Sequence, residues 1–172
     1  MKARKNSIVG IVVVILLAVF FVFYWYSNKT SINVAERIEN ENMDDISLKI
    51  YYLSPYDLML YPVSSVEDLI QRCEKKFVIY GSELEENIDL FKQIDDDDLK
   101  PVLKKTSDLD LRVYYVIESK KNGKLLDVAM WGEKDDTIFV NGTEVEENDV
   151  FYDVIIPFLP EEEAEELKDY IK

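Results

Sequence analysis

The chain contains no histidine and only one cysteine, Cys73, among its 172 residues. The absence of histidine excludes Ser-His-Asp and Cys-His nucleophile systems, the usual imidazole base, and zinc sites that use histidine. A single cysteine excludes an intrachain disulfide and a zinc-cysteine cluster. Apolar residues at helical spacing surround Cys73, which predicts a buried thiol. An extracellular domain without disulfides is more typical of a bacterial cell surface than of an animal extracellular space.

Glycine is also scarce, with five residues in the whole chain. Gly10 lies in an N-terminal apolar run, and Gly81, Gly123, Gly132 and Gly142 are scattered over the remainder. This spacing excludes a glycine-rich phosphate loop, and a lone glycine in the apolar run excludes a G-x-x-x-G packing motif. Because these absences remove most signatures of catalysis, we expect no enzyme activity and no cofactor.

The longest uninterrupted apolar run is Ile8–Tyr26, which carries no charged side chain. As a helix it reaches roughly 28 Å, close to the hydrocarbon thickness of a bilayer. Tyr24, Trp25 and Tyr26 close the run, and such amphipathic rings favour the headgroup boundary. We therefore predict a transmembrane anchor over residues 8–26. A cleaved signal peptide is the alternative, although its apolar core is usually shorter and small residues precede its cleavage site.

Basic residues indicate the direction of the anchor. Lys2, Arg4 and Lys5 precede the run, whereas acidic residues dilute the few basic ones that follow it. The positive flank of a membrane helix stays in the cytoplasm. Residues 1–7 are therefore predicted to form a cytoplasmic tail of a single-pass cell-membrane protein, with residues 27–172 outside.

Acidic residues outnumber basic ones by 35 to 20, and the formal net charge is −15. All the acidic residues, but only 17 of the 20 basic ones, follow the apolar run. Such a surface repels the phosphates of nucleic acids and of anionic lipids, so we expect no nucleic-acid partner. Cations, basic peptides or neutral ligands are favoured instead. Acidity also serves simply to keep a small extracellular domain soluble.

Periodicity divides the remaining chain into a stalk and one domain. Residues 27–45 are polar and predict a stalk, and residues 46–172 are enough for one domain with its own core. Alternation predicts strands over 48–52, 109–117 and 126–130. A turn signal at 54–57 predicts a returning strand over 58–62, and the hairpin signal Asn141-Gly142 predicts strands over 137–140 and 143–145. Apolar spacing predicts helices over 66–77, 84–94, 151–158 and 160–171, with 77–80 either a short strand or a continuation of the first helix. Strands and helices cluster, which predicts an α+β fold with helices packed on a mainly antiparallel sheet.

The best candidate for a metal site is the run Asp95, Asp96, Asp97 and Asp98. Calcium prefers six to eight oxygen ligands from a loop in which carboxylates alternate with other ligands and a glycine turns the chain. The four aspartates are contiguous and no glycine is near, so we expect no metal. Asp97 or Asp98 is instead predicted to cap a short helix that holds Pro101 in its first turn.

Tyrosine is frequent, with 11 residues, and adjacent tyrosines on a strand place one ring on each face of a sheet. The outward ring of Tyr114 or Tyr115, together with Trp131 and Phe139, is our predicted partner-binding surface. Alternation alone does not decide which face is outward. Tyrosine also simply suits strands, without any binding role.

These observations predict a single-pass, membrane-anchored extracytoplasmic protein of bacterial type with a non-catalytic binding or accessory domain for a protein, peptide or glycan. One alternative is a small carboxylate- or cation-dependent cell-envelope enzyme, which requires a cleft where acidic groups converge. The other is a structural subunit of a membrane complex. It requires an exposed apolar surface, for which Phe151, Ile155 and Phe158 are candidates.

Overall fold

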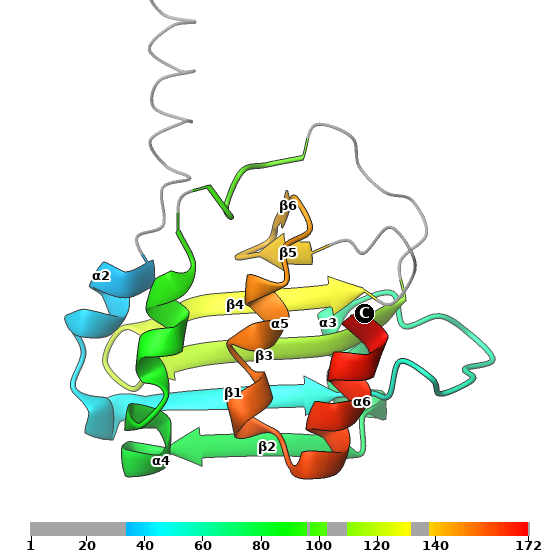
Figure 1. Ribbon diagram of the computed structural model, residues 1–172, viewed down its shortest axis with the longest axis horizontal. Coiled ribbons are helices and arrows are strands. Elements are labelled where there is room, and N and C mark those ends of the chain that lie inside the picture. Colours follow the sequence, from blue (N-terminus) through cyan, green and yellow to red (C-terminus); the bar gives the residue numbers. More distant parts are fainter. Residues whose placement is uncertain (1–33, 96, 103–109, 132–137, 172) are drawn as a thin grey trace, which may run out of the picture. The chain divides into compact units, whose positions relative to one another are not determined.

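The computed structural model describes residues 34–95, 97–102, 110–131 and 138–171 (Figure 1). The predicted cytoplasmic tail and transmembrane anchor, and the first part of the predicted stalk, lie outside these residues. Within the described ranges, no helix has the length and apolar character needed to cross a bilayer. The fold there is α+β with a six-stranded antiparallel sheet, which confirms the predicted fold class.

The sheet has the strand order β2-β1-β3-β4-β5-β6, and every neighbouring pair is antiparallel. The strands are β1 (Ile46–Tyr52), β2 (Lys75–Tyr80), β3 (Leu111–Ser119), β4 (Gly123–Trp131), β5 (Ile138–Val140) and β6 (Thr143–Val145). Strands β3 to β6 form a meander, and β1 joins it by pairing with β3. All the predicted strands except 58–62 are therefore present, with small differences at their ends.

The hairpin between β5 and β6 forms at Asn141 and Gly142, as the sequence predicts. Their φ values are 48° and 78°, which suit a two-residue turn with both residues in the left-handed region. The turn is also tied to β4, because the Asn141 amide donates to the Asp127 carbonyl over 2.8 Å. The Asn141 side-chain oxygen accepts from the Asp127 amide over 3.0 Å.

Most helices cover one face of the sheet (Figure 1). They are α2 (Val34–Glu39), η1 (Met43–Asp45), α4 (Gly81–Glu85), η2 (Ile88–Gln93), α5 (Val150–Asp153), η3 (Ile156–Phe158) and α6 (Glu161–Ile171). The core beneath them includes Phe91, whose ring lies 6.1 Å from that of Tyr115 and 5.9 Å from that of Phe158. The predicted helix 84–94 is two shorter elements, α4 and η2, but its apolar face is buried as expected.

Helix α3 (Val66–Arg72) lies on the opposite face of the sheet (Figure 1). The Ser65 hydroxyl caps it by accepting a hydrogen bond from the Asp68 amide over 3.1 Å. A second cluster of buried side chains lies on this face: Tyr51, Leu53, Val63, Leu69, Leu111, Tyr114, Val116, Ala129 and Trp131. Both faces of the sheet therefore carry apolar cores.

The domain begins earlier than the sequence predicts. Val34 and Ile38 are buried on one face of α2, and the Arg37 guanidinium donates to the Leu125 carbonyl over 3.1 Å. The predicted stalk is wrong for residues 34–45, which pack on the domain. The two apolar residues at i and i+4 form a helix face that the surrounding polar residues obscure in the sequence.

The region between β1 and β2 also differs from prediction. Residues 58–62 form a loop instead of a strand, and the helix that starts at Val66 ends at Arg72. Cys73 is extended, with φ −68° and ψ 130°, so the chain leaves the helix and enters β2. Of the two alternatives for residues 77–80, the strand is therefore correct.

Candidate functional site

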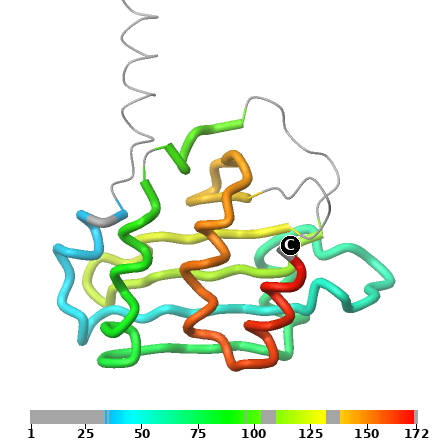
Figure 2. Tube along the Cα trace, in the orientation of Figure 1, coloured from blue at the N-terminus to red at the C-terminus, as the bar shows by residue number. Residues whose placement is uncertain are grey.

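The loop after β1 exposes the most apolar surface in the described part of the chain. Figure 2 shows the chain running from the end of β1 out into this loop and back to α3. The loop presents four large side chains that we call the apolar tip, with exposed fractions of 60% for Tyr56, 101% for Leu58, 95% for Leu60 and 73% for Tyr61. Burying a leucine side chain is worth about 1.5–3 kcal/mol, and contiguous exposed apolar side chains mark interaction sites.

Arg112 fixes the first part of this loop, at Ser54 and Asp57. The register of β3 and β4 shifts between Leu111 and Val113, and such an irregularity re-aims the side chain it contains. Arg112 is only 8% exposed, and one guanidinium nitrogen donates to the carbonyls of Ser54 and Asp57, both over 3.0 Å. Two backbone oxygens of the loop are thereby held by one buried side chain.

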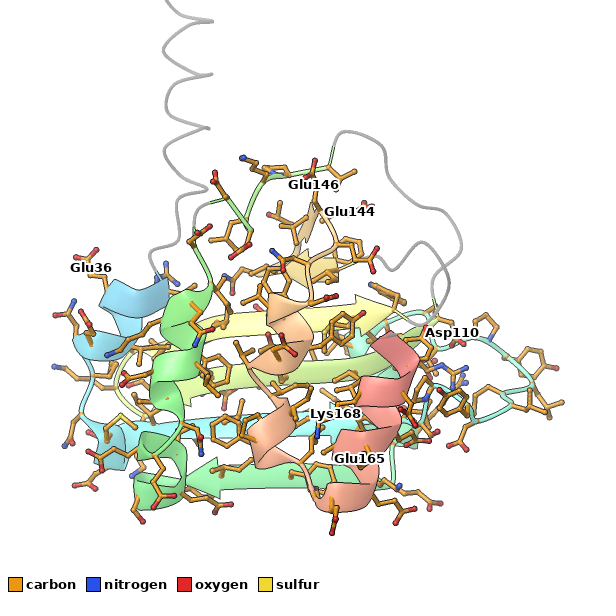
Figure 3. The ribbon with its side chains drawn as sticks, in the orientation of Figure 1. Glu36, Asp110, Glu144, Glu146, Glu165 and Lys168 are labelled. Atoms are coloured by element: carbon orange, nitrogen blue, oxygen red, sulfur yellow. The ribbon has the colours of Figure 1, made fainter. Side chains whose placement is uncertain are left out.

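Asp110 fixes the last part of the loop, at Val63. Its carboxylate pairs with the Arg112 guanidinium and accepts a hydrogen bond from the Val63 amide over 2.8 Å. Figure 3 shows Asp110 at the end of the sheet from which the loop projects. The Leu111 amide donates to the Val63 carbonyl over 2.8 Å, and the Arg72 guanidinium donates to the Tyr61 carbonyl over 3.2 Å.

A third set of contacts joins the start of the loop to α6. The Ser54 hydroxyl donates to the Glu166 carboxylate, and the Tyr56 ring lies edge-on to the Tyr170 ring at 6.2 Å. The tip is therefore exposed while its base is held from β3, α3 and α6. A surface that is already ordered loses little conformational entropy on binding.

The structure separates the four residues of the predicted partner-binding surface. Tyr115 lies under the helices and is fully buried, and burial raises the pKa of its hydroxyl well above the ordinary value. Tyr114, Trp131 and Phe139 share the α3 face, where the Trp131 and Phe139 rings are 5.9 Å apart. Tyr114 and Trp131 are buried there, whereas Phe139 is half-buried. The partner-binding role of this group stays a prediction.

The described aspartates of the run, Asp95, Asp97 and Asp98, lie in a local turn. Asp95 accepts backbone hydrogen bonds from Asp97 over 2.7 Å and from Asp98 over 3.2 Å. Residues 97–99 are a turn and not a helix, so the predicted helix cap at Asp97 or Asp98 is wrong, and Pro101 lies in a bridge to Val145. Asp96 is outside the described residues. Over the described ranges, no three His, Cys, Asp or Glu residues gather in a way that could hold a metal ion.

Two other predicted features are corrected. Phe151, Ile155 and Phe158 are buried in the helix-covered core, so they offer no exposed surface for a membrane complex. Cys73 is half-buried, and this burial raises the pKa of its thiol. The apolar tip was missed because Leu58–Tyr61 was interpreted as a strand, although its residues do not alternate between apolar and polar.

Comparison with protein-family models, with curated proteins and with solved structures gives no match for this chain.

Proposed function

We propose that this protein is anchored in the cell membrane by Ile8–Tyr26 and binds a partner protein through its extracytoplasmic domain, without catalysis. The observation that carries the proposal is the apolar tip. Leu58 and Leu60 are almost fully exposed while the backbone around them is fixed by Arg112 and Asp110. Large apolar side chains that stay exposed on a fixed loop favour a binding role.

The chemistry of the tip favours a protein partner over a glycan. Leu58 and Leu60 offer no hydrogen-bonding groups to sugar hydroxyls, but they fit an apolar pocket. Tyr56 and Tyr61 flank them with rings that have both apolar faces and a polar edge, a composition enriched where proteins meet. Since the chain has a net charge of −15, a partner with a basic rim around its pocket is favoured electrostatically.

Photo-crosslinking in the membrane tests the binding role. A benzoyl-phenylalanine residue at Leu60 of the full-length chain should give a discrete crosslinked product in expressing cells, and Leu58→Ser should abolish it. The matched control places the same residue at Glu67, which is exposed on α3. Equal products from both positions, or none from position 60, would contradict the proposal.

Cysteine labelling tests the topology separately. In a Cys73→Ser background, a cysteine at exposed Ser64 should react with a membrane-impermeant maleimide in intact cells. A cysteine at Asn6 should react only after lysis. The reverse pattern would place the domain in the cytoplasm. If the labelled Ser64→Cys protein were found only in the culture medium, the chain would be cleaved and secreted.

A further inference from the structure

The two edges of the sheet differ in how they are covered. Figure 1 shows β2 at one edge and β6 at the other. Segment 100–102 covers β6, where the Val102 amide donates to the Glu144 carbonyl over 3.0 Å and the Glu146 amide donates to the Lys100 carbonyl over 3.3 Å. No described segment pairs with the outer side of β2. An uncovered edge presents backbone N–H and C=O groups that can pair with another strand.

Strand β2 has few of the features that usually protect an edge. It contains no proline, and its register with β1 runs unbroken from the Ser47–Tyr80 pair to the Tyr52–Lys75 pair. Val78 is 36% exposed and Tyr80 is 57% exposed. Lysine is the common protective residue, but Lys75 is paired with Glu163 over 2.8 Å and Lys76 lies over the Tyr51 ring at 4.9 Å.

A groove follows this edge on the helix-covered side. Its volume is about 450 Å³, and it is lined by β2, by η3 and by the turn that leads from η3 to α6. Phe77 and Ile79 contribute from β2, Pro157 and Phe158 from η3, and Glu83 from α4. Because side chains alternate along a strand, a chain paired with β2 would direct every second side chain towards this groove.

We propose that β2 accepts an extended, basic peptide segment of a partner protein as an additional strand, with apolar side chains at alternate positions in the groove. Backbone hydrogen bonds to an edge strand give such complexes affinity, and side-chain pockets give specificity. The basic character follows from Glu83 in the groove, from exposed Glu74, Glu85 and Glu86 near the two ends of β2, and from the net charge of −15.

A second copy of this chain is electrostatically disfavoured at the same edge, because it carries the same negative charge. The edge is a different surface from the apolar tip, which lies in the loop after β1. The inference therefore depends neither on the tip nor on the direction of the membrane anchor.

The test measures binding of a capped seven-residue peptide of alternating lysine and valine to the full chain in nanodiscs of zwitterionic lipid. Fluorescence anisotropy of the labelled peptide should show saturable binding that weakens as salt increases. Hydrogen exchange of residues 75–80 should slow when the peptide is bound. A peptide of the same composition with its lysines and valines in separate blocks should bind at least about fivefold more weakly, because it cannot present valine at alternate positions.

Two matched pairs of variants locate the site. Val78→Lys should weaken binding at least about fivefold, and Ile70→Lys, the same change at an exposed position of α3, should not. Glu83→Lys should weaken binding more than Glu85→Lys, which makes the same charge change outside the groove lining. The second pair keeps the test decisive if Val78→Lys fails to fold.

Three results would overturn the proposal. The first is no saturable binding, and the second is equal binding of the alternating and block peptides, which would indicate charge attraction alone. The third is self-association of the chain that Val78→Lys abolishes, which would show that a second copy takes the edge.

Discussion

The hydroxyl of Tyr52 donates a hydrogen bond to the carboxylate of Glu166 over 2.9 Å. Tyr52 is the last residue of β1 and is fully buried, whereas Glu166 lies in α6 near the end of the chain. Burial, followed by the hydrogen bond to Glu166, raises the pKa of Tyr52, so its hydroxyl stays protonated at neutral pH. The same carboxylate accepts from Ser54, so it joins α6 to the start of the loop that carries the apolar tip.

Tyr52→Phe should therefore destabilise the domain. The change removes one hydrogen bond to a charged group, and we expect a loss of about 1.5 kcal/mol in the free energy of unfolding. Urea denaturation of the full chain in a mild detergent measures it. A loss below about 0.5 kcal/mol would show that water replaces the hydroxyl at Glu166 without cost.

The same substitution at Tyr115 should raise the free energy of unfolding or leave it unchanged. Its hydroxyl is buried and has no hydrogen-bond partner among the described residues. Because an unsatisfied buried polar group costs about 1–3 kcal/mol, Tyr115→Phe should leave the stability unchanged or raise it. The identical chemical change on neighbouring strands makes Tyr52→Phe the matched comparison. A clear loss of stability in Tyr115→Phe would indicate a bound water molecule at this hydroxyl.

The features that were predicted correctly depend on residues close together in the sequence. The Asn141–Gly142 turn depends on two residues that tolerate positive φ, and alternation over β3 and β4 depends on side chains within each strand. The spacing of Leu84, Ile88 and Phe91 also predicts one buried face, although the backbone there is not one continuous helix.

Features set by distant contacts could not be predicted in this way. Leu58 and Leu60 have the composition of a strand, but Arg112 of β3 fixes the start of their loop through contacts 55 and 58 residues apart in sequence. Similarly, pairing with β1 decides that Phe77–Tyr80 is a strand, and the packing of α3 decides which face Tyr114 occupies. The candidate site was missed because its exposure is a tertiary property.

Arg112→Lys should loosen the loop and destabilise the domain together. A lysine ammonium cannot reproduce the planar, forked contacts to Ser54, Asp57 and Asp110, and part of a buried polar network is left unsatisfied. We expect a loss of about 2–3 kcal/mol and faster proteolysis within residues 54–62. Arg37→Lys is the control, because Arg37 is exposed and contacts the Leu125 carbonyl instead of the loop, so it should cost less than about 1 kcal/mol. Equal losses in the two variants would contradict the role assigned to Arg112.

The ion pair between Lys75 and Glu163 predicts a pH dependence. Its hydrogen bond lowers the pKa of Glu163 and raises that of Lys75. A lowered carboxyl pKa stabilises the fold above the ordinary glutamate value of about 4.3, and this contribution is lost as the pH falls through the lowered pKa. The raised pKa of Lys75 acts at alkaline pH. Its contribution to stability is fully present below about pH 10.4 and is lost as the pH rises through the raised pKa.

Glu163→Gln should therefore lower the stability at pH 7 by about 0.5–1 kcal/mol, a modest value because Lys75 is partly exposed to solvent. The difference from the unmodified chain should shrink below about pH 4.3. Urea midpoints measured from pH 3 to 8 test this, with Glu162→Gln, one residue earlier and exposed, as the control. A difference that persists unchanged at pH 3 would mean that Glu163 acts through packing instead of charge.

The leucines of the apolar tip provide the last prediction. Leu58→Ser and Leu60→Ser should each change the free energy of unfolding by no more than about 0.5 kcal/mol, because these side chains are exposed in the folded chain as well as in the unfolded one. Leu69→Ala, at a fully buried position under the sheet, should cost about 2–5 kcal/mol. Urea denaturation measures all three. Losses above about 1 kcal/mol in the serine variants would mean that the tip packs on the domain in solution, and a binding role would then lose its main support. If the tip is neutral for folding, the leucines do not serve the stability of their own chain, and the proposed contact with a partner protein keeps its main support.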